Sequence, residues 1–366
     1  MLKWNCQGGI KKNHTANEEE KVAAITNLQY RLEPGGPRRE DENYAFRVGR
    51  RVFLFVFVKL LIMENDSQLR RGGMSLDKPR IAVVGAGKVG SALALLLGAQ
   101  GYPVAGIASR SISSALRAAE QLGVPATDRP EEITPGADVV FITTPDRVIA
   151  QVAAEINERG GFKPGQVVFH TSGAHAAGEV GAARRSGALA ASLHPLQSFA
   201  DVKTAMENLP GSYFALEGDA AALPYAQLIV KDLGGKSFSI EARDKPLYHA
   251  AACIASNYLV SLMHLATGLY GRFGLSRQEA FEALYPLVKG TINNIGRVGP
   301  AQALTGPVAR GDGSTLQGHL EVLKPIDGLE LELYRKLGLY TVGVALEKGS
   351  INADQGEILE QIFKEA

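Results

Sequence analysis

One glycine-rich segment constrains the fold of this chain more than any other feature. Residues 80–90 read RIAVVGAGKVG, an apolar run that enters a G-x-G-x-x-G turn, and an Ala- and Leu-rich stretch follows. Gly85 permits a tight turn from strand to helix, Gly87 lets the backbone approach a pyrophosphate, and Gly90 lets the helix pack closely on the strand. The apolar segments on both sides supply the strand and the helix that such a turn requires.

The predicted helix after this turn offers hydrogen-bond donors to a phosphate group. The pyrophosphate would lie on unpaired N–H groups at the N-terminus of this helix, where the helix dipole favours negative charge. We therefore predict a dinucleotide-binding turn, with cofactor contacts from Gly85, Gly87, Lys88, Val89 and Gly90.

The end of the next predicted strand indicates which dinucleotide binds. The strand spans residues 103–108, and Ser109-Arg110-Ser111 stands where an NAD site places an acidic residue on the ribose 2′-hydroxyl. An arginine between two serines suits a 2′-phosphate, which it would hold through charge-assisted hydrogen bonds. The sequence thus predicts NADP(H), with contacts from Ser109, Arg110 and Ser111. In the alternative, Arg110 is a solvated loop residue and Ser111 or Ser113 caps the following helix.

Length and composition set bounds on the function. The chain has 366 residues, 45% of them hydrophobic, which suffices for two ordinary domains. A net charge of +1 gives no support to a nucleic-acid surface. The two cysteines, Cys6 and Cys253, cannot form a disulfide framework or a multi-thiolate metal site, and they fit a reducing cytoplasm. We expect a cytoplasmic protein with no metal and no nucleic-acid or membrane partner.

Residues 1–73 differ from the rest of the chain. The segment 52–63 is apolar but too short to span a bilayer, and it lies too far along the chain for a signal peptide. Residues 70–73 (RRGG), directly before Met74, are what a translated purine-rich ribosome-binding sequence would encode. We hypothesise that synthesis starts at Met74 and that residues 1–73 are not part of the native protein. The alternative is a disordered N-terminal extension.

From Met74 onward, strands and helices alternate, which predicts a parallel sheet with helices on both faces. Strands are expected at 80–84, 103–108, 137–143, 166–171, 189–194, 213–217 and 236–240, and helices at 91–101, 113–122, 145–159 and 219–233. The helices expected after residue 240 are 245–273, 276–297, 314–323, 327–347 and 353–365. We predict an α/β fold: a doubly wound, mostly parallel Rossmann sheet in residues 74–240, followed by an all-helical domain in residues 241–366.

Polar residues follow three predicted strands, at the edge where open α/β sheets bind ligands. Thr143 and Thr144 are predicted to face the cofactor ribose, with a capped strand-to-helix turn as the alternative. Ser172 is predicted to bond to a nicotinamide ring or a substrate. His194 can polarise a carbonyl or imine, or donate a proton, although a lone histidine is as often a structural hydrogen-bonding group.

A polar stripe marks the first predicted helix of the second domain. Lys245, His249, Cys253 and Asn257 follow one another at steps of four, which places them on one slowly drifting face. The residues between them are mostly apolar, so these polar groups need partners. A substrate cleft between the domains would supply partners for His249 and Asn257. The alternative is a network with a neighbouring helix or a second subunit, and Cys253 and His264 are interpreted as core residues.

A loop at 304–312 (LTGPVARGD) joins two predicted helices. Either Arg310 binds a substrate carboxylate, or Arg310 and Asp312 form a turn pair that positions Ser314 as a helix cap. The sequence shows no nucleophile elbow, no Cys/His metal spacing and no P-loop lysine. The expected chemistry is therefore that of the cofactor, hydride transfer, while the protein orients the substrate and supplies a proton.

Together these segments resemble a bacterial family of Rossmann-like proteins with a C-terminal helical domain of unknown function, often labelled NADP oxidoreductases. The resemblance extends from about Arg80 to the C-terminus. It rests on the motifs Gly85-x-Gly87-x-x-Gly90, Thr144-Pro145-Asp146, His170-Thr171-Ser172-Gly173, His194-Pro195-Leu196-Gln197-Ser198-Phe199, Tyr248-His249-Ala250-Ala251, Ser256-Asn257-Tyr258 and Thr305-Gly306-Pro307-x-x-Arg310-Gly311-Asp312. More distantly, the layout is similar to pyrroline-carboxylate reductase, prephenate dehydrogenase and the β-hydroxyacid dehydrogenases.

The resemblance implies a homodimer packed through the helical domains and leaves the substrate unnamed. Prephenate dehydrogenases have a His-Pro at the position that His194-Pro195 occupies. β-Hydroxyacid dehydrogenases use a Lys-x-x-x-Asn pair on the first helix of the second domain. Here His249 follows Lys245 at that spacing and Asn257 stands further along the helix, which argues against a lysine-acid mechanism.

We predict an NADP(H)-dependent oxidoreductase that acts on a small carbonyl, imine or hydroxy acid held between the domains. Thr144 and Ser172 line the nicotinamide side, and His194, His249 and Asn257 contact the substrate, with a histidine as the proton donor. The alternatives are a non-catalytic NADP(H)-binding sensor and an assembly protein whose polar stripe is a network between subunits.

Overall fold

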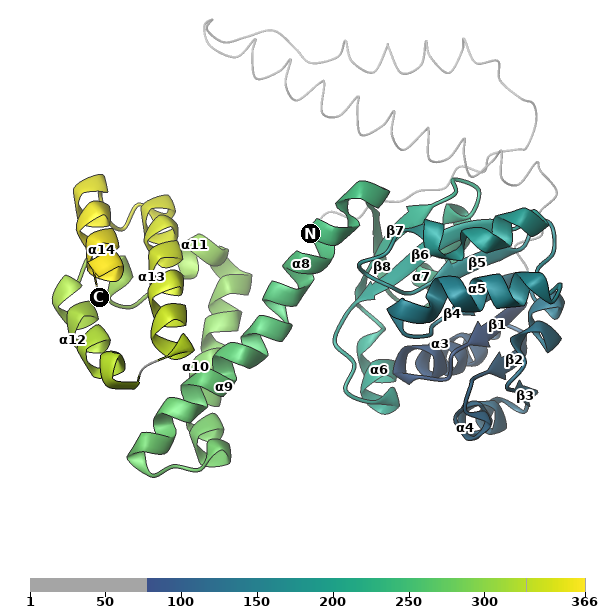
Figure 1. Cartoon of the computed structure of the whole chain (residues 1–366), viewed down its shortest axis with the longest axis horizontal. Helices are drawn as coiled ribbons and strands as arrows, with labels where there is room; N and C mark the ends of the chain where they lie inside the picture. The colour runs from purple at the N-terminus through teal and green to yellow at the C-terminus, as the bar shows by residue number, and fades with distance from the viewer. Residues whose placement is uncertain (1–77, 327, 366) are drawn as a thin grey trace, which may run out of the picture. The chain divides into compact units, whose positions relative to one another are not determined.

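The computed structural model describes residues 78–326 and 328–365, which are drawn in colour in Figure 1. The expectations for residues 1–73, among them a start of synthesis at Met74, lie outside the described residues.

Within the described residues, the strands form one sheet in the order β3-β2-β1-β4-β5-β6-β7-β8. Neighbouring strands run parallel except for β6 and β7, which are antiparallel. The strands are β1 (Ile81–Val84), β2 (Val104–Ala108), β3 (Ala126–Thr127), β4 (Val139–Ile142), β5 (Val167–His170), β6 (Leu189–Leu196), β7 (Tyr213–Gly218) and β8 (Lys236–Ser239). The predicted fold class, a doubly wound and mostly parallel sheet followed by helices, is confirmed.

Two apolar layers enclose the sheet, because successive strand side chains point to opposite faces. Ile81 and Val83 belong to one layer, and Ala82 and Val84 belong to the other. The first layer includes helices α3 (Lys88–Ala99), α4 (Ile112–Leu122), α6 (Val202–Asn208) and α7 (Leu223–Asp232), and the second includes α5 (Ile149–Glu158) and the 3-10 segment η4 (Ala177–Ser186). Burial on both faces fixes the strand register, since a slip by one residue would exchange the two sets of side chains.

The described chain after β8 is helical. Its helices are α8 (Lys245–Ala255), α9 (Asn257–Tyr270), α10 (Arg277–Val298), α11 (Pro300–Ala303), α12 (Gly313–Leu323), α13 (Leu329–Lys348) and α14 (Ala353–Glu365). A separate apolar cluster that includes Leu316, Val342 and Phe363 packs α12, α13 and α14 together. A capping box of Ser276 and Glu279 begins α10, at the start that the sequence predicts for this helix.

Some predicted elements begin or end elsewhere. The helix predicted at 245–273 is distorted at Ser256, where φ of −113° and ψ of −67° depart from helical values, and it divides into α8 and α9. The helix predicted from Pro145 starts as a 3-10 turn at Asp146, because a ψ of 142° keeps Pro145 extended. Neither β3 nor η4 follows from the sequence, since a two-residue strand and an irregular run carry no periodic pattern.

The register aligns the ends of the central strands at one edge of the sheet. Val84 of β1 lies beside Ile142 of β4, Ile142 lies beside His170 of β5, and His170 lies beside Ser192 of β6. The residues that follow these strands therefore gather at the same edge. The crevice outside the carboxyl ends is where open α/β sheets bind ligands, at the strand where the winding reverses, which here is β1.

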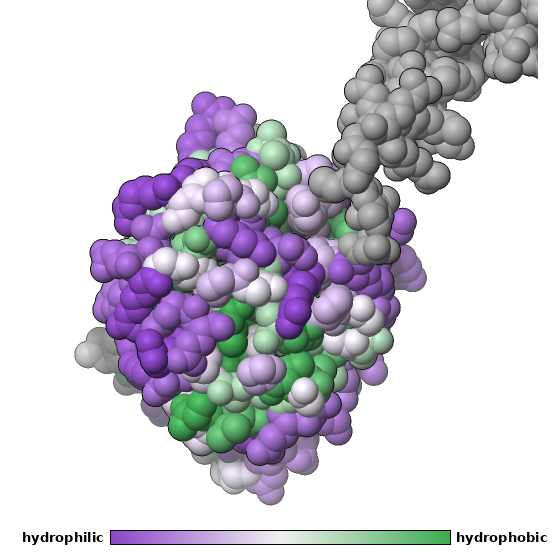
Figure 2. Space-filling model, turned by 90° about the vertical axis from the view of Figure 1, so that its right-hand side faces the viewer, coloured by the Kyte–Doolittle hydropathy of each residue, from purple (hydrophilic) through white to green (hydrophobic). Residues whose placement is uncertain are grey.

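The surfaces of the two regions differ in character. Figure 2 shows one face of the sheet region, on which hydrophilic side chains predominate and hydrophobic ones gather in the lower part of the view. The helical stretch Ala242–Phe273 differs from this face, because it is apolar and few of its residues are buried. Among the described residues, this stretch alone is long and apolar enough to cross a membrane, judged by length and composition.

Candidate functional site

The turn between β1 and α3, residues 85–90, is here called the phosphate turn. Two of its three glycines, Gly85 and Gly90, leave no room for a side chain. Gly85 has φ of 112°, a conformation that favours glycine. A Cβ atom on Gly90 would lie 2.0 Å from the carbonyl oxygen of Gly85 and 2.2 Å from Oγ1 of Thr143. At Gly87, in contrast, a Cβ atom would meet nothing within 4 Å. The fold requires glycine at 85 and 90, whereas Gly87 is exposed and open to a ligand.

The N-terminus of α3 presents its first N–H groups at this turn. The N–H of Ser91 donates to the carbonyl oxygen of Gly87 at 3.0 Å, so the N–H groups of Lys88, Val89 and Gly90 precede the first intrahelical bond. The first turn of α3 contains no acidic side chain. Backbone donors, the helix dipole and the exposed Lys88 all favour an anion here, so the residues present fit a diphosphate.

Two threonines follow β4 and have different roles. The hydroxyl of Thr143 donates to the carbonyl oxygen of Gly85 at 2.6 Å, which fastens the phosphate turn to the end of β4. Because this hydroxyl uses its proton inside the protein, it has only lone pairs to offer a cofactor ribose, and the predicted contact of Thr143 with the ribose stays a prediction. Oγ1 of Thr144 is buried and has no hydrogen-bond partner among the described residues. Buried hydroxyls without a partner are rare, so this one fits a ligand that supplies the partner.

The segment after β2 presents Arg110 to solvent. The N–H of Ser109 donates to the carbonyl oxygen of Thr127 at 3.0 Å, which fixes the backbone at the strand end. Ser111 occupies the N-cap position of α4, but its hydroxyl bonds to that of Ser113 at 2.9 Å and caps no N–H group. The side-chain capping role that the alternative gives to Ser111 is therefore wrong. Arg110 and Ser111 are exposed where β2 ends.

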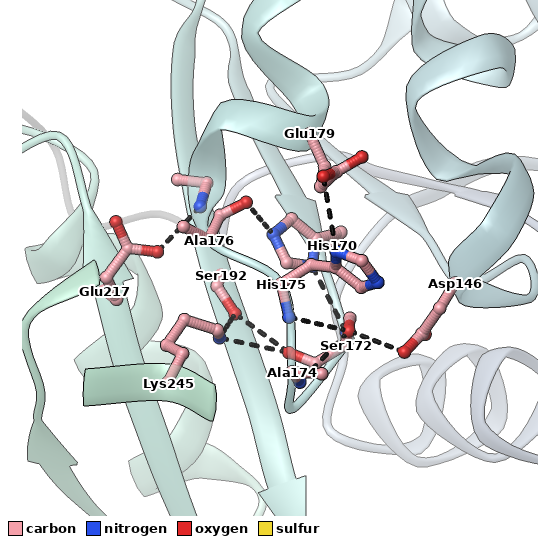
Figure 3. Close-up of polar contacts among 11 residues, drawn as sticks. Asp146, His170, Ser172, Ala174, His175, Ala176, Glu179, Ser192, Glu217 and Lys245 are labelled. Atoms are coloured by element: carbon pink, nitrogen blue, oxygen red, sulfur yellow. Dashed lines mark hydrogen bonds and ion pairs between the residues drawn. The ribbon is translucent and has the colours of Figure 1, made fainter. Parts of the chain in front are cut away.

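A second group of side chains lies where α8 contacts the ends of β5 and β6 (Figure 3). Lys245 of α8 is fully buried, and its Nζ donates to Oγ of Ser192 at 2.6 Å and to the carbonyl oxygen of Ser172 at 3.1 Å. Fully buried ammonium groups are usually paired with a carboxylate. Here both direct acceptors are neutral, so one lysine joins the helix to two strand ends without a direct counter-charge.

The loop after β5 is held in place by the hydroxyl of Ser172. This hydroxyl donates to Oδ2 of Asp146 at 2.8 Å and accepts from the N–H groups of Ala174 and His175 at 3.3 Å and 3.2 Å. These bonds use its one proton and both lone pairs. The structure thus corrects the prediction that Ser172 bonds to a nicotinamide ring or a substrate: the hydroxyl holds the loop that carries Gly173.

Two histidines converge beside Gly173. A Cβ atom on Gly173 would lie 2.7 Å from Nε2 of His194 and 2.7 Å from Nδ1 of His249, and the two ring centroids are 6.2 Å apart. Nδ1 of His194 and the hydroxyl of Tyr248 are 2.7 Å apart and hydrogen-bonded. Nδ1 of His249 is buried and has no partner among the described residues. Glycine at position 173 is what lets both rings approach this loop.

Two hydrogen bonds join α8 to β6. Lys245 and Tyr248, three residues apart on the helix, bond to Ser192 and His194, which are two residues apart on one face of the strand. We call His170, His194, Lys245, Tyr248 and His249 the histidine–lysine cluster.

The sequence and the structure were compared with known proteins. Family profiles described as a Rossmann-like domain and as a domain of unknown function, DUF2520, match residues 64–195 and 212–341. Protein TM1727 from Thermotoga maritima is 32% identical, with a TM-score of 0.61, and the match covers 73% of this chain and 99% of that protein. The chain belongs to the DUF2520 family of Rossmann-like proteins.

More distant structures share the fold of this DUF2520 protein. Protein BF3122 from Bacteroides fragilis, described as a candidate NADP oxidoreductase, is 22% identical with a TM-score of 0.55, over 68% of this chain and 92% of that one. An imine reductase from Pseudomonas sp. is 17% identical with a TM-score of 0.53, over 79% of this chain and 99% of that one. Among curated proteins, no sequence matches.

Burial sets the charges of the histidine–lysine cluster in this DUF2520 protein. Burial lowers the pKa of Lys245 to about 8. Burial, assisted by the positive charge of Lys245, lowers the pKa values of His170 and His194 to about 4. Burial raises the pKa of Tyr248 to about 12. Near neutral pH the cluster therefore contains these two imidazoles in neutral form, a protonated phenol and a mostly protonated amine.

Other predicted site residues lie elsewhere. The distortion at Ser256 separates Asn257, the first residue of α9, from the helix that carries His249, and Asn257 is exposed. The structure thus does not bring Asn257 into the cluster. Arg310 and Asp312 form the predicted turn pair, with 3.8 Å between Nη2 and Oδ2, but Asp312 itself caps α12, in place of the predicted Ser314.

Some residues of the site do not follow from the sequence. The sequence places Lys245 on the polar stripe but predicts no role for it. It predicts no role for Asp146, Ser192 or Tyr248 either. One signal was present: Lys245 and His249 stand four residues apart on a largely apolar helix, so both face the sheet. Among the described residues, no group of three or more His, Cys, Asp or Glu side chains could hold a metal ion.

Proposed function

We propose that this chain is an NADP(H)-dependent oxidoreductase that transfers a hydride between the nicotinamide ring and a small carbonyl, imine or hydroxy-acid substrate. The alignment of two regions at one sheet edge carries the proposal. The phosphate turn follows β1, and the histidine–lysine cluster lies at the ends of β5 and β6. With adjacent strands about 4.8 Å apart, β1 and β6 are separated by roughly 14 Å along this edge.

The chain's own residues would hold the cofactor at several points. The N–H groups of Lys88, Val89 and Gly90 face its diphosphate beside the open Gly87. The hydroxyl of Thr144, buried and without a partner among the described residues, is available to it next to the phosphate turn. Ser109, Arg110 and Ser111 would hold a 2′-phosphate, for which a guanidinium is well suited. When bound, the cofactor supplies the hydride chemistry.

The histidine–lysine cluster would orient the substrate and exchange its proton. Lys245 and Ser172 hold the loop of Gly173, which keeps the rings of His194 and His249 close together. Nδ1 of His249, buried and unpaired among the described residues, is the nitrogen placed to donate a proton to the reacting group or to accept one from it. Two proteins with this fold, one described as a candidate NADP oxidoreductase and the other as an imine reductase, support this proposal.

We further propose that a second copy of the chain covers the apolar faces of α8 to α10. Leu247, Val260 and Leu287 expose 76%, 68% and 67% of their surfaces. Apolar side chains exposed in such a contiguous series mark an interface. The apolar stretch Ala242–Phe273 includes α8, whose Lys245 contacts Ser192 of the sheet and whose His249 approaches the loop of Gly173. We therefore assign this stretch to a dimer interface and not to a membrane. The predicted cytoplasmic location is kept as part of this proposal. Sedimentation equilibrium should give a dimer, whereas a monomer at micromolar concentration would contradict this assignment.

The proposal is tested by incubating the protein with NADPH deuterated at both C4 positions and pools of small imine and carbonyl compounds, the latter including the keto acids that are the oxidised partners of hydroxy acids. We expect one compound class to be consumed together with NADPH and its product to carry one deuterium. A Gly90→Ala protein should transfer none, and a Lys336→Met protein, changed at a distant position in α13, should behave as the wild type. Saturable NADPH binding without deuterium transfer to any compound would favour a non-catalytic sensor.

A further inference from the structure

The hydrogen bond between Tyr248 and His194 has one satisfactory direction. Nδ1 of His194 is the hydrogen-bond partner of the Tyr248 hydroxyl among the described residues, at 2.7 Å. A hydroxyl that donates to Nδ1 uses its own proton and satisfies that nitrogen. The reverse direction would leave the hydroxyl proton without an acceptor among the described residues in a part-buried place, which costs free energy. The neutral ring of His194 therefore carries its proton on Nε2.

The surroundings of His194 keep this ring neutral. Lys245 and His249 face it from α8, Asp146 faces it from the turn before α5, and His170 faces it from β5. Lys245 disfavours a second positive charge, and burial does so more strongly, which agrees with the lowered pKa of His194. Asp146 acts in the opposite direction, but its carboxylate is bonded to the hydroxyl of Ser172.

The protonated nitrogen points to the place where the substrate is expected. Nε2 of His194 and Nδ1 of His249 lie at equal distances from the position of a Cβ atom on Gly173. The ring planes are inclined at 82°, so the two nitrogens face the loop from different directions. A small polar atom bound beside Gly173 would meet an N–H donor from His194.

We propose that Tyr248 fixes His194 as an Nε2–H donor, and that the site therefore takes a carbonyl substrate through its oxygen in preference to a protonated imine. This inference rests on the proposed function and narrows its substrate class. A carbonyl oxygen has two lone pairs for the Nε2–H group. A protonated imine has none on nitrogen: even where Nδ1 of His249 accepts its N–H group, the Nε2–H group of His194 is left without an acceptor, near the charge of Lys245. Tyr248 is a positioning residue that acts through His194.

The first test reads the tautomer directly and needs neither cofactor nor turnover. Nitrogen-15 NMR of the full chain labelled at histidine, at pH 7, should show His194 with the proton on Nε2 and with Nδ1 bare. A His194→Gln protein identifies the signal. Tyr248→Phe should produce a mixture of tautomers. Tyr213→Phe is the matched control, because Tyr213 also packs against Phe238, and it should leave the signal unchanged.

A proton on Nδ1 of His194, a doubly protonated ring at pH 7, or no change in the Tyr248→Phe protein would overturn the inference. These outcomes are independent of cofactor binding. Failure of NADP+ to shift any resonance would contradict the proposed function while leaving the tautomer result standing.

The second test compares two probes of the same ring size, cyclopentanone and 1-pyrroline, in the presence and absence of NADP+. We expect cyclopentanone to shift the Nε2–H signal of His194 saturably, at concentrations at least tenfold lower than those at which 1-pyrroline does. In the Tyr248→Phe protein this preference should shrink toward unity. A preference for 1-pyrroline, or no response to cyclopentanone, would overturn the assignment of the substrate class.

Discussion

The phosphate turn and the histidine–lysine cluster lie at the same sheet edge but are built by different means. The turn is made of backbone from one continuous segment, and its shape depends on missing Cβ atoms at Gly85 and Gly90. The cluster is made of side chains from three separate elements, β5, β6 and α8, and depends on burial and charge. A substitution in the phosphate turn therefore either fits or clashes, whereas a substitution in the histidine–lysine cluster changes charges and pKa values by degrees.

The largest effect is expected at Gly90. Gly90→Ala would place a Cβ atom 2.0 Å from a backbone oxygen, which cannot be relieved by a side-chain rotation. We expect a loss of roughly 3 kcal/mol or more in the free energy of unfolding and no measurable NADPH binding. Chemical denaturation and calorimetry check both.

Gly87→Ala is the matched control for the turn. Its φ of −81° suits alanine and its Cβ atom would meet nothing, so stability should change by about 1 kcal/mol or less. NADPH binding should still weaken at least tenfold, because the new methyl group stands where the diphosphate approaches. Equal stability losses in the two proteins would contradict the steric account of the turn.

The next effect concerns His170, which is fully buried with a pKa of about 4. Its pKa lies below the usual value of 6.5, so the unfolded chain binds the proton first as the pH falls. The free energy of unfolding should decrease by roughly 3 kcal/mol between pH 6.5 and pH 4 from this residue. Denaturation at a series of pH values measures the slope.

His194 has the same lowered pKa, so His170→Gln should lose about half of the wild-type slope, and His264→Gln, which alters an exposed histidine, should retain all of it. A slope in the His170→Gln protein as steep as in the wild type would contradict the assigned charge state.

A smaller effect is expected at Arg110. Arg110→Asp exchanges a guanidinium for a carboxylate where a 2′-phosphate would lie, so NADPH binding should weaken about 10- to 100-fold and NADH binding should not. Arg117→Asp, seven residues further along the chain and within α4, is the control and should have little effect on either. Equal losses for both coenzymes, measured by calorimetry, would remove the selectivity claim.

The smallest change in stability is expected at Lys245. Lys245→Met removes two hydrogen bonds but also the cost of burying a charge, so the free energy of unfolding should change by roughly 1 kcal/mol. The pKa of His194 should rise, since a neighbouring positive charge is gone. An NMR titration of His194 checks the direction, with Lys236→Met as an exposed control. An unchanged pKa of His194 would show that Lys245 does not set it.

The same contrast explains how much of the molecule the sequence predicts. The phosphate turn is contiguous, and the periods of the flanking strand and helix are strong, so its residues and the fold class follow from the sequence. The roles of Thr143 and Ser172 do not, because which way a hydroxyl points depends on a tertiary neighbour: the oxygen of Gly85 for one and the carboxylate of Asp146 for the other.

The cluster shows a second limit. Residues from β5, β6 and α8 meet only when the sheet is assembled, so the partnership of Tyr248 with His194 carries no signal in sequence spacing. Asn257 shows the opposite case, in which the sequence spacing suggests a neighbour that the structure does not bring together with it. Its place on the polar stripe assumes a regular helix, and the distorted backbone at Ser256 has no marker in the sequence such as proline or glycine.

A crystal structure of the full chain with NADPH tests the central claim most directly. We expect the diphosphate on the N–H groups of Lys88, Val89 and Gly90, and the nicotinamide ring beside the loop of Gly173. Cofactor bound away from the phosphate turn, or no bound cofactor at saturating concentration, would contradict the account.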